Sequence, residues 1–331
     1  SWDFAGNQSL GIFPETSRIL FWGFEELSSE MGTTEVEVGR NPFRDAELSS
    51  GNDSGCARGE RLQIGDSINR ALWGSLQEGK LENQTDAFIE KPLNGWWNTI
   101  AAADLNSDGK PDFIVGNMGT NTQFKTTDSE PAELYYKDFD QNGSVDPIFN
   151  YYIQGKSYPY LTRDELLGQL ANKKSKFTNY ESYADATLEA IFDQTELQDS
   201  KKLVANHMET TLLLSNENGG YDIAQLPKQA QYSPVHNISV HDFNLDGNLD
   251  LLLLGNDQHF KLRLGKFDAN YGTLLLGNGK GQFNYVDQNV SGLKVQGDVE
   301  SSIIIDHKLF LGIHGEPLKT YKISTPTEKW K

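Results

Sequence analysis

Sulfur, long apolar runs and basic charge are all scarce in this chain of 331 residues. The single cysteine, Cys56, cannot form an intramolecular disulfide. No apolar run approaches the ~20 residues that a transmembrane helix needs. Only 29 Lys and Arg stand against 47 Asp and Glu, which gives a net charge of −18. Without a basic stripe to neutralise phosphates, nucleic acid is disfavoured as a partner.

Familiar catalytic motifs are missing from the sequence as well. It contains no glycine-rich phosphate loop, no nucleophile elbow and no His-Glu-x-x-His pair. The six histidines are scattered, without the spacing typical of metal ligands. Trp96 and Trp97 form an aromatic pair before a strand. We expect this pair to pack in the core, and a platform that stacks on sugar rings is the alternative.

What the chain does contain is a nine-residue pattern of Asp, Asn and Gly. It occurs at 104–112, 138–146 and 242–250, named here the first, second and third loop. Each copy has Asp or Asn at positions one, three and five, Gly at position six and Asp at position nine. One such copy could be an ordinary turn, because these residues favour turns. Three copies in one register instead predict a cation site in each loop.

The residue types of the loops fit calcium. Alternate residues of a tight loop point inward with their oxygens, position seven can offer a backbone carbonyl, and Gly permits the sharp turn. Calcium accepts six to eight oxygens in a flexible geometry, whereas magnesium demands a strict octahedron. We therefore expect about three Ca²⁺ ions, which would bring the net charge from −18 to about −12. The expected ligands are Asp104, Asn106, Asp108, Lys110 and Asp112; Asp138, Asp140, Asn142, Ser144 and Asp146; and Asp242, Asn244, Asp246, Asn248 and Asp250, with position seven contributing its backbone carbonyl.

The loops are not EF-hands, because position twelve is Val115, Phe149 or Leu253 instead of Glu. The flanking segments are short runs of β-branched, Leu and aromatic residues, which are typical of buried strands. A second unit, at 211–221 and 273–283, runs from an apolar strand through a Gly-containing turn to an aromatic residue. Loop hairpins that alternate with such Gly-turn hairpins predict four-stranded blades, and radial stacking of blades gives a β-propeller. The predicted fold class is therefore all-β.

The loops with their flanking strands resemble FG-GAP repeats of the VCBS type. Together with 94–98, 116–122, 158–167 and 183–189, they are similar to the C-terminal propeller region of the bacterial cartilage acidic protein family of Bacteroidota, over about residues 77 to 325. The resemblance implies a secreted or cell-surface protein, with a lipid anchor in the outer membrane as one option. It also implies a place beside an outer-membrane transporter complex for nutrient uptake, but no particular ligand. A protein or glycan partner is what we expect of a binding module at the cell surface.

Two function classes stay open at this point. One is a non-enzymatic binding module in which calcium rigidifies the blades. The other is a calcium-dependent polysaccharide lyase or hydrolase on a propeller scaffold. We expect the first, because loops that surround the ion with carboxylates leave little room for an open Lewis-acid position.

The blade pattern covers residues 77–331, whereas 1–76 fit it poorly. Residues 3–13 can be laid over the second loop but keep a single carboxylate, Asp3, so we expect a degenerate blade without metal or an irregular segment. Because the chain begins in mid-pattern, we expect an export signal or lipid-anchor cysteine upstream of it.

A helical insertion is expected at about 153–206, between blades. Thr162 and Glu165 form a capping box, which predicts a helix start, and a second helix is expected from about 180 to 192. The insertion is interpreted as a cap on one propeller face, with partner docking as the alternative. A cluster of Lys173, Lys174 and Lys176 is expected to be solvated.

Overall fold

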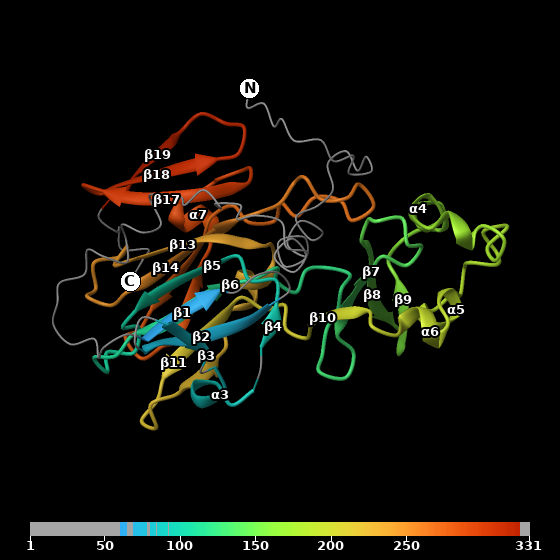
Figure 1. Cartoon of the computed structure of the whole chain (residues 1–331). Coiled ribbons are helices and arrows are strands. Elements are labelled where there is room, and N and C mark those ends of the chain that lie inside the picture. The colour runs from blue at the N-terminus through green and yellow to red at the C-terminus, as the bar shows by residue number, and fades with distance from the viewer. Residues whose placement is uncertain (1–59, 65–68, 78–79, 84, 92, 325–331) are drawn as a thin grey trace.

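The computed structural model describes residues 60–324, except 65–68, 78–79, 84 and 92 (Figure 1). The hairpin expected at 3–13, and most of the segment 1–76, lie outside the described residues. In the described part of the chain, no helix is both long and apolar enough to cross a membrane.

Antiparallel sheets make up most of the described chain, with four four-stranded sheets and one three-stranded sheet. We name them the N-terminal, split, inserted, continuous and C-terminal sheets. The N-terminal sheet contains β1 (Glu60–Ile64), β2 (Asn69–Gln77), β3 (Lys80–Asn83) and β4 (Asn94–Gly95); the split sheet contains β5 (Thr99–Ala103), β6 (Asp112–Gly116), β11 (Thr211–Ser215) and β12 (Tyr221–Ala224); the inserted sheet contains β7 (Ala132–Lys137), β8 (Asp146–Ile153), β9 (Lys156–Pro159) and β10 (Lys201–Ala205); the continuous sheet contains β13 (Val235–His241), β14 (Asp250–Gly255), β15 (Thr273–Gly277) and β16 (Phe283–Val286); and the C-terminal sheet contains β17 (Val299–Ile305), β18 (Lys308–Ile313) and β19 (Lys319–Lys322).

Short helices lie between the strands. They are α3 (Thr85–Phe88), α4 (Arg163–Gln169), η1 (Ala171–Lys173), α5 (Leu188–Ile191), α6 (Gln194–Leu197), η2 (Lys228–Gln231) and α7 (Gln288–Ser291).

The continuous sheet follows the predicted order, in which a loop hairpin and a Gly-turn hairpin pair as β13-β14-β15-β16. Its strand β14 is buried along its whole length. Leu251 and Leu253 pack in one hydrophobic cluster, and Leu252 and Leu254 pack in another. Because successive side chains of a strand point to opposite faces, both faces of this sheet are covered. That burial explains why the sequence shows an unbroken leucine run here instead of an alternating pattern.

The split sheet contains the same two hairpins, but they are not consecutive in the chain. β6 pairs with β11, with Thr211 opposite Val115, after the chain has left the sheet for residues 117–210. The two ends of this inserted segment are held together. The Asn117 side-chain amide donates hydrogen bonds to the carbonyls of His207 (3.0 Å) and Glu209 (3.3 Å), and Gly119 N–H donates to Met208 O (2.7 Å).

The inserted segment forms the sheet β10-β7-β8-β9, whose two faces are both covered. One face carries Ile148 and packs against the short helices through Leu166 and Ile191. The other face carries Phe149 and packs with Phe124, Trp96 and Phe267. In Figure 1 this sheet and α4–α6 lie together at one side of the molecule.

The helices α4, η1, α5 and α6 lie inside the segment expected to be helical, 153–206, but that segment also contains β9 and β10 and lies within the inserted sheet instead of between blades. The insertion lies within the split sheet, spans 117–210 and includes four strands as well as helices. Of its two predicted helices, the first is confirmed, with the capping box of Thr162 and Glu165 in front of α4. The second is wrong, because the chain forms turns until Thr187, which caps the short helix α5 in an extended conformation.

Two predictions about individual side chains have different outcomes. Packing of the tryptophan pair is confirmed, because Trp97 is buried and Trp96 lies against Phe124 with ring centroids 5.7 Å apart. Solvation of the lysine cluster is wrong for one member. Lys173 is buried, forms an ion pair with Glu196 and lies 4.9 Å from the centroid of the Phe192 ring.

Candidate metal centres

The first, second and third loops share one backbone conformation. Position four is left-handed in each, with φ of 63° at Ser107, 59° at Gln141 and 57° at Leu245. The glycine at position six has φ of 82°, 88° and 90°. Such values favour glycine, which explains why this residue recurs in all three copies. The repeated sequence pattern is therefore a repeated three-dimensional loop.

A common hydrogen-bond ladder holds the side chains at positions one, three and five. In the first loop, Asp104 accepts the N–H groups of Asp108 (3.1 Å) and Gly109 (2.9 Å). Asn106 Oδ1 accepts the same Asp108 N–H (3.1 Å), and Asp108 Oδ1 accepts that of Lys110 (2.8 Å). The second and third loops repeat each of these bonds. The loop backbone thus fixes where the candidate ligand oxygens lie.

The aspartate at position nine is buried in every loop. Asp112 accepts the N–H groups of Leu105 and of Ser215 on β11, both at 2.8 Å. Asp250 similarly accepts Phe243 N–H (2.8 Å) and Gly277 N–H on β15 (2.9 Å). In the first and third loops this carboxylate closes the loop and ties it to the third strand of the sheet, whereas Asp146 closes the second loop by accepting Phe139 N–H (2.9 Å). An oxygen has two lone pairs, so these bonds leave room for a cation as well.

The second loop brings its carboxylates closest together. One oxygen from each of Asp138, Asp140 and Asp146 lies within 4.8 Å of the others. Burial raises the pKa of Asp146 to about 6, and the charges of Asp140 and Asp138 add to this rise. Three carboxylates so close repel one another, and a bound cation offsets that repulsion. The residues of this loop therefore fit a hard divalent ion.

The first and third loops differ from the second at positions three and five. Their position-three residues are Asn106 and Asn244, whose amide groups donate to Asp108 (3.3 Å) and Asp246 (2.9 Å) at position five. Burial raises the pKa of Asp250 to about 6 in the third loop, and nearby Asp246 adds to the rise. Side-chain oxygens remain the candidate ligands in both loops, with fewer charges gathered within 4.8 Å than in the second loop.

The first and third loops lie side by side, whereas the second belongs to the inserted sheet. The β15–β16 turn at 278–281 connects them. Gly281 N–H donates to Leu105 O (3.0 Å) in the first loop. A Cβ atom at Gly279 would lie 2.4 Å from Asn248 Oδ1 in the third loop and 3.5 Å from Ser107 Oγ in the first. The turn thus lies between two candidate metal sites and is close to both.

One residue near the first loop was not predicted from the sequence. Ser215 Oγ donates to Asp108 Oδ2 (2.7 Å) and Asp112 Oδ1 (3.0 Å). It orients two candidate ligands, although it lies more than a hundred residues away in the chain. Gly277 occupies the matching position beside the third loop, so no shared sequence signal marks this contact. The backbone carbonyls of Lys110, Ser144 and Asn248 stay predicted ligands.

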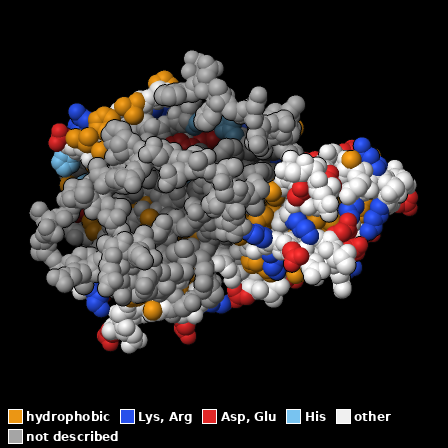
Figure 2. All heavy atoms as spheres, viewed as in Figure 1, with side chains coloured by type: hydrophobic (Ala, Val, Ile, Leu, Met, Phe, Trp, Pro, Cys, Tyr) orange, Lys and Arg blue, Asp and Glu red, His pale blue; other side chains and the backbone are white. Residues whose placement is uncertain are grey.

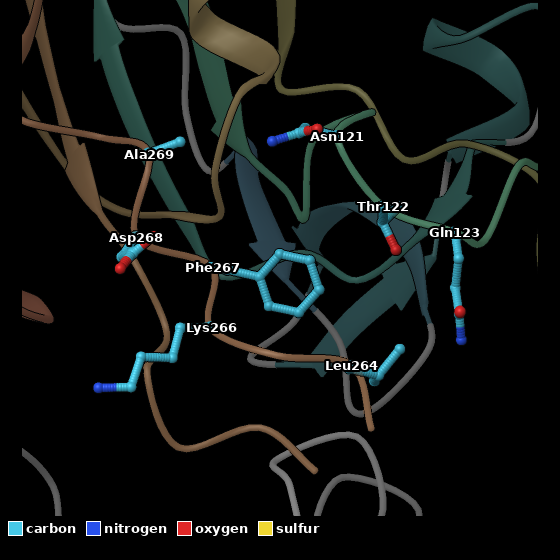
Figure 3. Close-up of a pocket in the computed structure, with 8 residues that line it drawn as sticks. All are labelled: Asn121, Thr122, Gln123, Leu264, Lys266, Phe267, Asp268 and Ala269. Atoms are coloured by element: carbon cyan, nitrogen blue, oxygen red, sulfur yellow. The ribbon is translucent and has the colours of Figure 1, made fainter. Parts of the chain in front are cut away.

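A hollow of about 300 Å³ lies where the inserted segment meets the β14–β15 connector (Figure 3). Residues 121–123 form one wall, and 264–269 form the other. The ring of Phe267 lies near the centre of the view, while Lys266 extends away from it. Its volume is at the lower end for small-molecule pockets. Five of its eight lining residues are polar or charged, which favours a small polar ligand or part of a larger one.

The comparison with known families agrees with the first loop. The FG-GAP repeat family matches residues 96–129, which include β5, the first loop and β6. None of the curated proteins matches the chain. The chain is thus a mainly β-sheet protein that contains an FG-GAP repeat. The match covers neither the second nor the third loop, which are linked to the first by their shared geometry.

Proposed function

We propose that this chain is a calcium-binding β-propeller that acts as a non-enzymatic binding module outside the cell or at its surface. The observation that carries the calcium assignment is the common loop geometry, with three carboxylates of the second loop gathered within 4.8 Å. About three Ca²⁺ ions would be held by the ligands named above. Their main role is structural, because each loop joins two neighbouring strands of one sheet.

The propeller architecture is supported by how the sheets meet. β5, β13 and β17 are each the first strand of their sheet and lie at its edge. β13 contacts both β5 and β17, and Ser239 Oγ lies 2.5 Å from Ser302 Oγ between two of them. The first strands of three sheets thus lie next to one another in succession. Radial stacking of blades around an axis produces this arrangement.

The binding surface is proposed at the junction between the inserted segment and the β14–β15 connector, where the hollow lies. The connector is anchored to the insertion, since Lys261 Nζ donates to Glu165 (2.7 Å) and Arg263 lies 3.8 Å from the Tyr160 ring centroid. Figure 2 shows basic and acidic side chains interspersed over the inserted segment. A protein or glycan suits such a mixed surface better than a strongly charged polymer. A cell-surface partner such as an outer-membrane transporter complex is the setting that the family resemblance implies.

Calorimetric titration of chelator-treated protein with Ca²⁺ tests the metal assignment. We expect about three sites, and loss of one site in Asp138→Asn, because position one is Asp in all three loops. Asp185→Asn is the matched control, because Asp185 is exposed in the same inserted segment and outside the loops. Equal calcium binding by Asp138→Asn and the control would contradict the assignment of the second loop.

Incubation with a panel of polysaccharides, with and without EDTA, tests the binding role against the enzymatic one. We expect binding to a protein or glycan without cleavage, and Lys266→Ala or Thr122→Ala should weaken that binding if the hollow takes part. Specific cleavage by the pure protein that stops in EDTA would overturn the proposal in favour of a lyase or hydrolase.

A further inference from the structure

A continuous series of hydrogen bonds connects the first loop to the third through the β15–β16 turn. In the first loop, the buried carboxylate of Asp112 accepts the N–H of Leu105 (2.8 Å). The carbonyl of Leu105 in turn accepts the N–H of Gly281 (3.0 Å), at the far end of the turn. Where β15 enters the turn, Gly277 N–H donates to Asp250 (2.9 Å), the position-nine carboxylate of the third loop. The buried position-nine aspartates of the two loops are thus linked through one short turn.

The turn is closely packed between these two contacts. Three glycines in it and just before it leave no room for a Cβ atom, which would lie 2.2 Å from Leu249 O at Gly277, 2.4 Å from Asn248 Oδ1 at Gly279 and 2.5 Å from Leu214 Cδ1 at Gly281. The turn is also closed from within, because Asn278 Oδ1 accepts the N–H groups of Lys280 (2.9 Å) and Gln282 (3.3 Å). Closely packed elements transmit small displacements, since there is no void to absorb them. A shift at one end of the turn therefore reaches the other end.

The second loop gives a reference within the same chain, because its position-nine carboxylate has its contacts elsewhere. Asp146 accepts the N–H of Phe139 (2.9 Å) in its own loop and interacts with the side chain of Gln169 on α4. All three residues belong to the inserted segment, 117–210. The second loop is therefore expected to bind its ion independently of the other two.

We propose that calcium binding at the first loop and at the third loop is coupled through the β15–β16 turn, so that occupation of either loop raises the affinity of the other. This inference rests on the proposed function, in which these loops bind Ca²⁺. Asp112 and the Leu105 carbonyl become fixed when the first loop is occupied, and the turn is ordered with them. The third loop then has less ordering left to undergo when it binds. Because coupling between two sites is reciprocal, each loop should raise the affinity of the other by the same factor.

Calorimetric titration with Ca²⁺ tests the coupling in variants at position one, which is Asp in all three loops. Asp138→Asn leaves the first and third loops as a pair. Adding Asp242→Asn to it leaves the first loop alone, and adding Asp104→Asn to it leaves the third loop alone. We expect the second ion to bind the pair at least fivefold more tightly than an ion binds either lone loop, which is the lower end of usual couplings. The affinity of the second loop should be the same with and without Asp242→Asn.

Asn278→Ala tests the turn itself, because Asn278 is exposed and lies outside both loops. The replacement removes the bonds that close the turn, so the coupling factor should fall close to one while both loops still bind. Asn216→Ala is the matched control. Asn216 Oδ1 closes the β11–β12 turn in the same way, by accepting the N–H groups of Asn218 (3.0 Å) and Gly220 (2.9 Å). This control should keep the fivefold coupling.

Hydrogen exchange gives a readout besides affinity. When the first loop alone is able to bind, calcium should slow amide exchange in the turn at 278–281, and Asn278→Ala should abolish that effect. Equal affinities of lone and paired loops, with calcium bound in each, would overturn this inference and leave the calcium assignment standing. Coupling that persists in Asn278→Ala would overturn the role of the turn. Absence of calcium binding at both loops would overturn the proposed function and this inference together.

Discussion

Replacing either of two aspartates of the first loop by alanine should lower the stability of the protein, but for different reasons. Asp108 at position five is exposed and makes its strongest contacts with Lys110 N–H and Ser215 Oγ at the surface. Asp112 at position nine is fully buried and accepts the N–H groups of Leu105 and Ser215. Asp112 therefore supports the fold with or without metal, whereas the main role proposed for Asp108 is that of a calcium ligand.

The structure gives the size of each effect. Asp112→Ala leaves two N–H donors without their acceptor, and an unsatisfied buried donor costs about 1–3 kcal/mol, so the loss is about 2–6 kcal/mol even in EDTA. Asp108→Ala should cost less than about 1 kcal/mol in EDTA, as surface changes commonly do. With calcium at a hundredfold excess over Kd, Asp108→Ala should also lose the stabilisation that calcium bound at the first loop would contribute, about 2.7 kcal/mol. Asp112→Asn keeps one acceptor oxygen and should fall between the two alanine variants.

Urea unfolding in EDTA and in calcium measures both effects. Asp246→Ala and Asp250→Ala repeat the comparison in the third loop, where Asp250 makes the matching bonds. If Asp108→Ala and Asp112→Ala lowered stability equally in EDTA, position nine would not close the loop as described. If EDTA left the stability of the unaltered chain unchanged, the loops would be turns without metal.

Three further variants test other contacts. Gly279→Ala should lower both stability and calcium affinity, because its Cβ would lie 2.4 Å from Asn248 Oδ1 and the residue has a φ of +68°. Gly168→Ala is the control, since this residue has free space in a helix, and it should be neutral or stabilising by up to about 1 kcal/mol. Equal melting temperatures of the two variants would contradict this prediction. Burial lowers the pKa of His207 below its usual value, so the contribution of this residue to stability is present above about pH 6.5 and lost as the pH falls. The melting temperature of His207→Gln should therefore depend less on pH between about pH 7.5 and 5.5 than that of the unaltered chain. An unchanged pH dependence would refute the assignment. Trp97→Ala should cost about 3–5 kcal/mol in unfolding experiments, as for a buried core tryptophan, and a cost below about 1 kcal/mol would show that it does not support the core.

Local features of the sequence predicted the loops and their strands well. The strands that flank each loop, and the Gly-turn hairpins at 211–221 and 273–283, occur where apolar runs and turn residues indicated them. Their signal is carried by neighbouring residues, so a short window contains all of it. The same is true of the capping box at Thr162, which needs only residues 162–165.

Long-range features could not be read in this way. The pairing of β6 with β11 joins segments separated by the whole insertion, and nothing local at Val115 indicates its distant partner. Lys173 is buried because Glu196 and Phe192 come from a separate helix and loop. Ser215 reaches the first loop only through that same β6–β11 pairing. These side chains depend on topology, which the residue pattern alone left open.

The clasp between the two ends of the inserted segment has a consequence for how the chain folds. β6 can pair with β11 only after about 90 intervening residues bring their ends together, and closing a flexible loop of that length costs on the order of 4 kcal/mol of chain entropy. An insertion that folds first removes this cost, because it delivers Asn117 and His207 already in contact. During synthesis the insertion emerges before β11, so it can fold before β11 is available to pair with β6. The split sheet is then completed by β11 and β12, which are synthesised after the insertion.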